Sequence, residues 1–368
     1  MEISRQSQTA GDNSQQLQVG NIGNLTIVNG ITEQRAREIF REMNEIARRD
    51  YTSDAYEMAL KRVNMFESLL MDKVQKVDGL LEEFADPSFQ YLLADAQRHA
   101  AASERESDYA TLTELLGCRA KQGYDRKIRA GISQAVKIVD KVDDDALCGL
   151  TASYAVWRMY PLAASCKNGI DTIDSAFSTL VYQPLPYGRE WIEHLEILNA
   201  VRCTPIARIR KFEDLYGSQI AGYICTGIKK DSDEYTKAME IIHSNSLPAN
   251  ILVDHEWNEG YVRLCVPHIE YLDHILVGTY DGKNSRGLNE KERAALREIW
   301  ALYSKDLNVK GNVQRRFDEE ISKRPNITAV REWWNSLPYA FNLTHAGIVL
   351  AHANAQQHDA DIDDRIVL

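Results

Sequence analysis

The fold class of this 368-residue chain is decided by residues 54–84, DAYEMALKRVNMFESLLMDKVQKVDGLLEEF. Apolar residues recur there at steps of three and four, which average close to the coiled-coil value of 3.5 over about four heptads. They are Tyr56, Leu60, Val63, Phe66, Leu70, Val74, Val77, Leu81 and Phe84. The pattern predicts one long amphipathic helix over about 54–84. A single stripe does not identify its partner, so the helix either joins neighbouring chains or belongs to a bundle within one chain.

The same period continues on both sides of this segment. Thr32 is a good cap for a preceding helix, and Asp86-Pro87 marks a stop and a restart. Further helices are expected over about 87–102, 107–122, 125–142 and 144–159, with short polar joints between them. We therefore expect residues 32–160 to form a helical domain, and the whole chain to be a mainly α, multi-helix protein.

The second half of the chain is less regular. Residues 161–188 have the character of an irregular linker that ends in Gln183-Pro184-Leu185-Pro186. A C-terminal helical domain is expected over 189–357, with an acidic tail at 358–368. Within it, two alternating apolar runs on either side of Asn258-Glu259-Gly260 predict one small β-hairpin over about 250–266.

The N-terminal leader differs from the rest of the chain in charge. Residues 6–31, QSQTAGDNSQQLQVGNIGNLTIVNGI, contain a single charged residue, Asp12. Alternating apolar residues on either side of a Gly/Asn-rich corner predict two short strands, which are too small to persist alone and leave unpaired backbone edges. Copies of the leader from several chains would satisfy those edges; the alternative is a disordered polar segment. The expected oligomerisation residues are Leu17, Val19, Ile22, Leu25, Ile27 and Ile31.

Composition excludes several classes of protein. The chain is 44% hydrophobic and 26% charged, with a formal net charge of −11, and its length suffices for two or three cores. No run approaches the roughly 20 apolar residues of a membrane helix, and the first thirty residues lack the pattern of a signal peptide, so we expect a cytosolic protein without membrane contact. The six cysteines are scattered singly, which favours buried hydrophobes over a disulfide framework or a zinc site.

Metal-capable side chains are densest between Asp254 and His274. On a helix Glu270 and His274 share one face, and a hairpin would return His255 towards them. This arrangement suggests a divalent-metal hydrolase or nuclease, although no H-E-x-x-H motif is present and ordinary surface and helix-end roles are favoured. No catalytic residue and no cofactor is predicted, because nucleophile elbows and phosphate-binding glycine loops are both missing from the sequence. An enzymatic role is therefore open but not favoured.

Basic residues gather around the joint between two predicted helices. Such a cluster suits contact with the phosphates of a nucleic acid, although a solvated helix face is the favoured interpretation. Its members are Arg119, Lys121, Arg126, Lys127 and Arg129.

Three motifs together resemble an uncharacterised family of bacterial proteins. They are GDNSQQLQVGNIGNLTIVNGIT at residues 11–32, LLEEFADPSFQYLLADAQRHAA at 80–101 and LTHAGIVLAHANAQ at 343–356. The family combines a short-strand leader, a helical body and a C-terminal LT-x-x-G-I-x-I-x-x-A-N helix, and no activity is established for it. Its leader resembles those of bacterial defence and conflict proteins, which implies a role in phage defence by analogy. Here Ala355-Gln356-Gln357 replace the basic residues that often follow the last motif.

These observations favour a homo-oligomeric cytosolic scaffold or sensor in bacterial phage defence or conflict. The expected partner is another copy of the chain, with nucleic acid or a phage protein as further possibilities. The alternatives are a metal-dependent hydrolase or nuclease that uses the Asp254–His274 region, and a nucleic-acid-binding sensor without catalysis.

Overall fold

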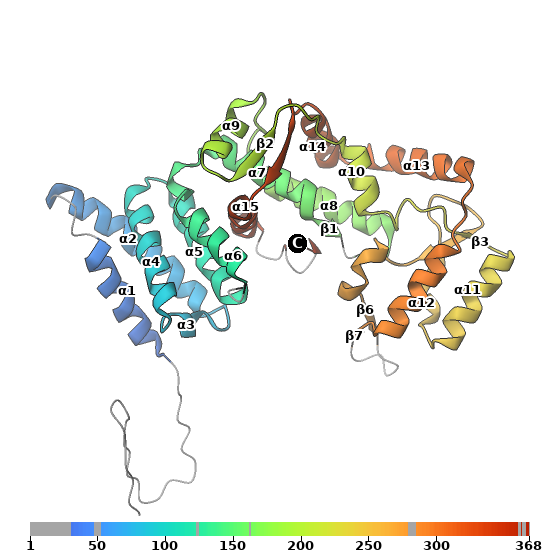
Figure 1. Cartoon of the computed structure of the whole chain (residues 1–368), viewed down its shortest axis with the longest axis horizontal. Coiled ribbons are helices and arrows are strands. Elements are labelled where there is room, and N and C mark those ends of the chain that lie inside the picture. Colours follow the sequence, from blue (N-terminus) through green and yellow to red (C-terminus); the bar gives the residue numbers. More distant parts are fainter. Residues whose placement is uncertain are drawn as a thin grey trace, which may run out of the picture.

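The computed structural model describes residues 31–47, 53–122, 125–161, 163–278 and 285–359, together with Ile362 and Ile366–Val367 (Figure 1). Five of the predicted oligomerisation residues, Leu17, Val19, Ile22, Leu25 and Ile27, lie outside these ranges, so the strand-forming leader stays a prediction. The sixth, Ile31, is half-buried and packs against the core of its own chain.

Helices dominate the described residues, as the sequence predicts. The first half folds into α1 (Glu33–Ala47), α2 (Ser53–Val74), α3 (Leu80–Glu83), α4 (Pro87–Ala102), α5 (Glu106–Gln122), α6 (Arg126–Val136), the 3₁₀ turn η1 (Val139–Lys141), α7 (Asp144–Arg158) and α8 (Cys166–Leu180). The helices α1 to α6 lie side by side at one end of the molecule in Figure 1. The predicted succession of short-jointed helices after Asp86-Pro87 is confirmed, except that the helix predicted over 125–142 ends at Val136 and is followed by η1.

The long helix predicted over 54–84 is interrupted, and this is a correction. α2 ends at Val74, and a turn follows in which Gly79 takes a positive φ of 82° before α3 begins at Leu80. The apolar period continues through the turn because Val77 and Phe84 still point into the core, although the backbone is not helical. The stripe of α2 faces α4 and α5 of the same chain, so it is part of an intrachain bundle.

The predicted linker contains a helix, and the described residues of the predicted acidic tail contact the body. α8 lies within the supposed linker 161–188 and is capped by Ser165. Its buried face includes Cys166, Ile170, Ile173, Phe177 and Leu180. In the tail, Ile362 is buried, and strand β9 (Ile366–Val367) pairs antiparallel with β1 (Tyr160–Pro161). Glycine and hydroxyl residues obscure the helical period of α8 in the sequence.

Later elements complete the same core. They are α9 (Glu190–Ile197), α10 (Phe212–Gln219), α13 (Leu307–Ile321), α14 (Pro325–Asn335), α15 (His345–His358) and an antiparallel ribbon of β2 (Val201–Thr204) with β8 (Ala340–Leu343). Buried residues from 36 to 223 and from 317 to 362 form one hydrophobic cluster. The predicted division into two helical domains near residue 189 is therefore wrong, because this single cluster runs across it. We name the unit formed around this cluster the body.

A second core lies in an inserted unit, which runs from residue 228 to residue 303. It comprises β3 (Ile228–Lys229), α11 (Asp233–Ser244), η2 (Ala249–Ile251), β4 (Leu252–Asp254), β5 (Tyr261–Leu264), η3 (Ile269–His274), β6 (Leu276–Gly278), β7 (Ser285–Gly287) and α12 (Glu290–Ala301). The predicted hairpin is confirmed: Leu252 pairs with Leu264 and Asp254 with Val262. β3 adds a third strand that the sequence did not indicate.

The two passages of chain that lead into and out of the inserted unit are hydrogen-bonded to each other, and we name this place the neck. The hydroxyl of Thr226 donates to the carbonyl oxygen of Ser304 at 2.6 Å, and the N–H of Ser304 donates to the carbonyl oxygen of Gly227 at 2.8 Å. Two passages separated by more than seventy residues therefore lie side by side.

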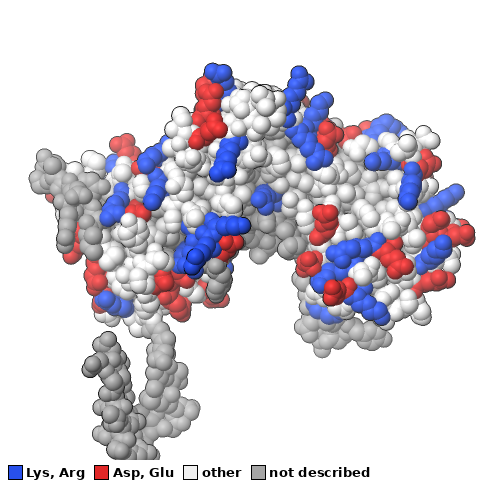
Figure 2. All heavy atoms as spheres, in the orientation of Figure 1, with Lys and Arg blue, Asp and Glu red and all other residues white. Residues whose placement is uncertain are grey.

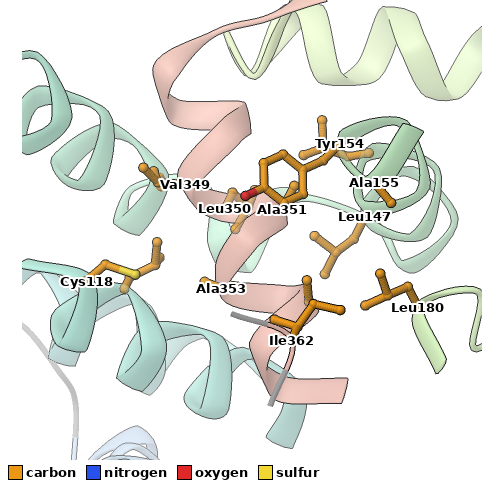
Figure 3. Close-up of a cluster of buried hydrophobic side chains, with 14 of the residues drawn as sticks. Cys118, Leu147, Tyr154, Ala155, Leu180, Val349, Leu350, Ala351, Ala353 and Ile362 are labelled. Carbon is orange, nitrogen blue, oxygen red and sulfur yellow. The ribbon is translucent and has the colours of Figure 1, made fainter. Parts of the chain in front are cut away.

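The C-terminal helix α15 is the centre of the body. It packs against α5, α6 and α7 at once, and Figure 3 shows its residues Val349, Leu350 and Ala353 surrounded by side chains of the other helices. Gly347 permits a close approach to the chain before β2, because a Cβ there would lie 2.0 Å from the carbonyl oxygen of Ala200. Within the described ranges no helix, α15 included, is long and apolar enough to cross a membrane.

Replacing Gly347 by Ala tests this packing. The added methyl group meets backbone that has no room to yield, so we expect Gly347→Ala to lower the free energy of unfolding by about 2–3 kcal/mol. Gly311→Ala is the matched control in α13, where the new Cβ meets nothing within 4 Å. It should instead raise the free energy of unfolding by about 0.5–1 kcal/mol through helix propensity. Urea denaturation measures both; a loss of similar size in the two variants would contradict the packing described for α15.

Candidate functional site

The predicted basic cluster forms an exposed corner between α5 and α6. Lys121, Arg126, Lys127 and Arg129 are all exposed, and Figure 2 shows basic side chains gathered over this corner. α6 begins there because the carboxylate of Asp125 accepts the N–H of Lys127 at 2.7 Å. We name these four residues the basic corner.

Arg119, the fifth predicted member, is not part of this surface. Only 5% of it is exposed, and its guanidinium lies 3.1 Å from the carboxylate of Glu83. It also donates to the hydroxyl of Ser88 at 3.2 Å. Arg119 thus ties α5 to the end of α3 and the start of α4, and its charge is compensated within the body.

His255, from the predicted metal set, is buried beneath the sheet of the inserted unit. Its Nε2 donates to the carbonyl oxygen of Cys225 at 2.7 Å, and its Nδ1 accepts the N–H of Trp257 at 3.1 Å. Both ring nitrogens are therefore used, which corresponds to a neutral imidazole, and burial lowers its pKa in agreement. In this arrangement the ring has no lone pair left for a metal ion.

The other two residues of that set lie in η3. Glu270 is exposed, and its N–H donates to Nδ1 of His268 at 3.0 Å, which caps the turn. His274 is the last residue of η3, and its side chain lies outside the description. Among the residues that the structure describes, no group of three or more His, Cys, Asp or Glu could hold a metal ion.

Two of the cysteines, Cys148 and Cys225, have the character of unreactive thiols. Burial raises the pKa of Cys225 to about 12 and that of Cys148 to about 11, so both are protonated at neutral pH. A thiolate, rather than a thiol, is the nucleophile in catalysis. Neither cysteine is therefore poised for covalent chemistry.

A buried ion pair at the base of the inserted unit was not found from the sequence. Arg263 is completely buried, and its Nε and Nη2 each lie 2.7 Å from a carboxylate oxygen of Glu256. Its second Nη2 contact is the carbonyl oxygen of Ala164 at 2.8 Å, and Glu256 accepts the N–H of Cys166 at 3.0 Å. The pair thus fastens the hairpin to the start of α8. Burial opposes the charge on Glu256, but the hydrogen bonds and charge of Arg263 outweigh it and lower its pKa to about 2.

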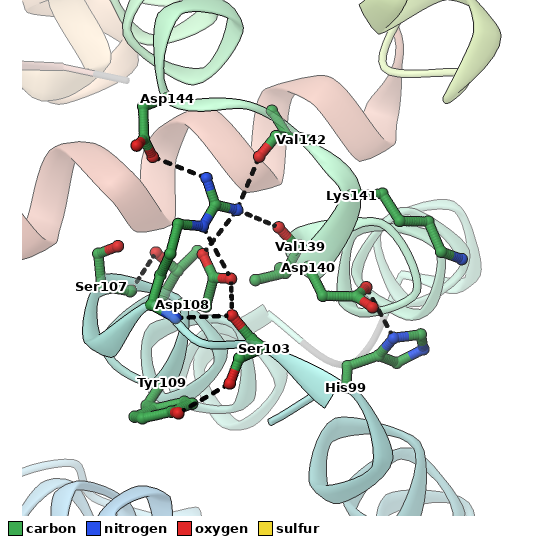
Figure 4. A network of polar contacts seen from close by, with 12 residues as sticks. His99, Ser103, Ser107, Asp108, Tyr109, Val139, Asp140, Lys141, Val142 and Asp144 are labelled. Atoms are coloured by element: carbon green, nitrogen blue, oxygen red, sulfur yellow. Dashed lines mark hydrogen bonds and ion pairs between the residues drawn. The ribbon is translucent and has the colours of Figure 1, made fainter. Parts of the chain in front are cut away.

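A second polar network joins helices within the body (Figure 4). Arg105 lies at its centre and donates to the carbonyl oxygens of Val139 and Val142 at 3.0 and 2.7 Å and to Asp144 at 2.7 Å. Nearby, His99 contacts Asp140 at 2.8 Å. All these partners lie at the ends of α4, α5 and η1 or the start of α7, so the network satisfies helix ends and is structural.

Residues in two of the motifs quoted above also have structural roles. The carboxylate of Asp86 accepts the N–H groups of Ser88 and Phe89 at 2.8 and 3.0 Å and caps α4. Gln97, fully buried, donates to the carbonyl oxygen of Phe40 at 2.8 Å. In α15 the amide of Asn354 donates to the hydroxyl of Thr151 at 2.9 Å. These motifs therefore carry packing and capping information.

Comparison with known proteins gives one match. A protein-family model matches residues 30–363, which include all of the body and the inserted unit. None of the curated proteins and none of the solved structures matches the chain.

Removing the charge of Glu256 tests the buried pair. Glu256→Gln leaves Arg263 buried without a counter-charge, which typically costs about 3–5 kcal/mol; because the side chain of Glu256 is 27% exposed, we expect about 2–3 kcal/mol. The matched control is Glu319→Gln, which removes an exposed pair with Arg315 and should cost under about 0.5 kcal/mol.

The same pair predicts a pH dependence. The pKa of Glu256 is lowered in the folded state, so its contribution is complete above the unfolded value of 4.5 and is lost as the pH falls towards 2. The difference in unfolding free energy between wild type and Glu256→Gln should therefore be constant at neutral pH and shrink below about pH 4.5. A difference that grows on acidification would show that Glu256 is not stabilised as a carboxylate.

Proposed function

The chain belongs to the family whose model spans residues 30–363, and we propose that it is a self-assembling scaffold or sensor whose leader joins copies of the chain. One observation carries the proposal: the body completes its own core. The stripe of α2 that was a candidate for joining chains is filled by α4 and α5 of the same chain. Since α2 is not available to join chains, we assign that role to the leader.

The sequence of the leader supports this role. Its alternating apolar residues predict strands too short to stand alone. Because residues 6–31 contain only one charged residue, little charge repulsion would oppose the stacking of identical segments. The remaining net charge of the chain lies on the body, which favours its solubility when copies are brought together. Ile31, packed on the core of its own chain, fixes the point from which the leader departs.

The setting we propose is bacterial phage defence or conflict in the cytoplasm. Its support is the likeness of the GDNS-and-glutamine leader to those of conflict proteins. In such a setting the body presents the surfaces that meet a phage protein or a nucleic acid, and the leader sets how many copies respond together.

Deleting residues 1–30 tests the assembly. The body's core begins at Ala36, so we expect the truncated chain to keep its helical circular dichroism and thermal unfolding while its mass in solution falls from an oligomer to a monomer. Light scattering coupled to gel filtration measures the mass. A truncated chain that keeps the mass per particle expected for the same oligomer would refute the role of the leader.

Point variants refine this test. Val19→Asp combined with Ile27→Asp puts two charges on the predicted strands and should disrupt the oligomer, because like charges in stacked strands repel. Ser4→Asp combined with Gln8→Asp adds the same charge outside them and should leave the mass unchanged. Equal disruption by both pairs would indicate that total charge, rather than the strands, controls assembly.

The basic corner favours a second candidate function, nucleic-acid binding without cleavage. Lys121, Arg126 and Lys127 are exposed together, and no ion pair of theirs is found among the described residues. Such groups attract phosphates, even on a chain of net charge −11, because local charge decides short-range contacts in salt.

Charge reversal tests this second function. In the full-length chain, Lys121→Glu, Arg126→Glu and Lys127→Glu together should weaken binding to a labelled duplex at least about tenfold and reduce its salt dependence. The control is Lys291→Glu with Arg297→Glu, two exposed basic residues on α12. Binding that is unaffected by the triple variant, or weakened as much by the control, would exclude the basic corner as the contact surface.

A further inference from the structure

A hollow lies beside the neck, at one edge of the inserted unit. It has a volume of about 540 Å³, within the usual range for small-ligand sites, and it is lined by β3, the first turns of α11 and the chain that follows α12. Three lysines from these three elements line it: Lys229, Lys237 and Lys305. We name this space the lysine hollow.

The charge of these lysines is not compensated by ion pairs within the described part of the chain. The neighbouring Lys230 contacts Asp254 at 2.7 Å, whereas no carboxylate of the described residues lies within 4.0 Å of the ammonium groups of Lys229, Lys237 or Lys305. Glu234 is the one acidic residue that lines this hollow. Three positive groups against one negative group favour an anion, and lysine binds phosphate well as a point charge.

A second hollow of about 410 Å³ adjoins the first and has a different character. Trp300, Ile224 and Leu307 supply apolar lining, and Asp306 and Lys310 add one charge of each sign. Lys305 lines both spaces together with Tyr303 and Ser304. Trp300 is only partly buried and lies 4.7 Å from the ring of Tyr303, so an aromatic surface borders the hollow. We name this space the tryptophan hollow.

The two hollows together span the joint between the body and the inserted unit. Gly217 and Gln314 belong to the body, whereas Trp300 and Lys237 belong to the inserted unit. A ligand that filled both spaces would need a compact anionic group at one end and a flat or apolar group at the other.

We propose that the two neighbouring hollows, which share Tyr303, Ser304 and Lys305, bind one nucleoside phosphate, with its phosphates among Lys229, Lys237 and Lys305 and its base against Trp300. This site goes beyond self-assembly and does not depend on the leader. It gives the body a small-molecule ligand at the joint of its two cores, where occupancy would bridge the body and the inserted unit.

Titration calorimetry on the full-length chain tests the proposal, with ATP, pyrophosphate and adenosine as probes in the presence of EDTA. We expect ATP to bind at least about tenfold more tightly than pyrophosphate or adenosine, because each fragment keeps one half of the contacts, and we expect its affinity to fall with salt. No binding of ATP at millimolar concentration would overturn the proposal, as would equal affinity for ATP and pyrophosphate.

Variants assign the two halves. Lys237→Glu with Lys305→Glu should weaken ATP binding at least about tenfold. The control pair, Lys61→Glu with Lys76→Glu, changes exposed residues in and just after α2 and should alter the affinity less than about twofold.

Trp300→Leu should weaken the binding of ATP and leave the binding of pyrophosphate unchanged, and Trp300→Phe should retain most of the wild-type affinity for ATP. Equal losses in the two lysine pairs, or equal losses of ATP and pyrophosphate in Trp300→Leu, would overturn the assignment. The chain lacking residues 1–30 should give the same isotherms, so failure of self-assembly and failure of this site are separate results.

Discussion

The structure depends above all on the burial of α15, a helix with buried residues on nearly every side. Such a helix is unstable in water unless other elements surround it, and here α5, α6 and α7 do so. Its polar groups have lost water and need partners: Asn354 finds Thr151, and Gln357 contacts Thr111 at 3.0 Å. More than two hundred residues separate α15 from most of α5, so the body closes only when the end of the chain reaches its middle. Contacts so distant in sequence slow folding.

Much of the fold could be predicted from local patterns, because each pattern is tied to a local physical cause. The steps of three and four gave the helices, Asp86-Pro87 marked the start of α4, and alternation around Gly260 predicted the hairpin. The errors arose where tertiary contacts override a local pattern. The stripe of α2 continues past Val74 because Val77 and Phe84 still reach the core from a turn. The packing of α15 against α5, α6 and α7 and the burial of Ile362 could not be predicted, because contacts so distant in sequence produce no local periodicity.

The candidate sites divide in the same way. Sequence reasoning located the basic corner, since exposed basic residues at a helix joint are visible as a cluster, but it also included Arg119, whose compensation by Glu83 depends on how α3 meets α5. It could not find the pair of Glu256 and Arg263, because two of its acceptors are main-chain oxygens, one of them at Ala164 in a distant segment. The lysine hollow draws on separated elements, and no spacing in the sequence links Lys229 to Lys305.

The neck at Thr226, Gly227 and Ser304 has a consequence for how this architecture can vary. Because the two passages are hydrogen-bonded to each other, the distance between the ends of the inserted unit is set by the neck and not by what lies beyond it. A segment of another length with adjacent ends would keep this geometry of the neck, although it would lose the contacts of Glu256 and Arg263 with the start of α8. The chain is in this respect a continuous framework with an inserted segment, and that segment can vary most freely where it does not contact α8 or α13 of the body.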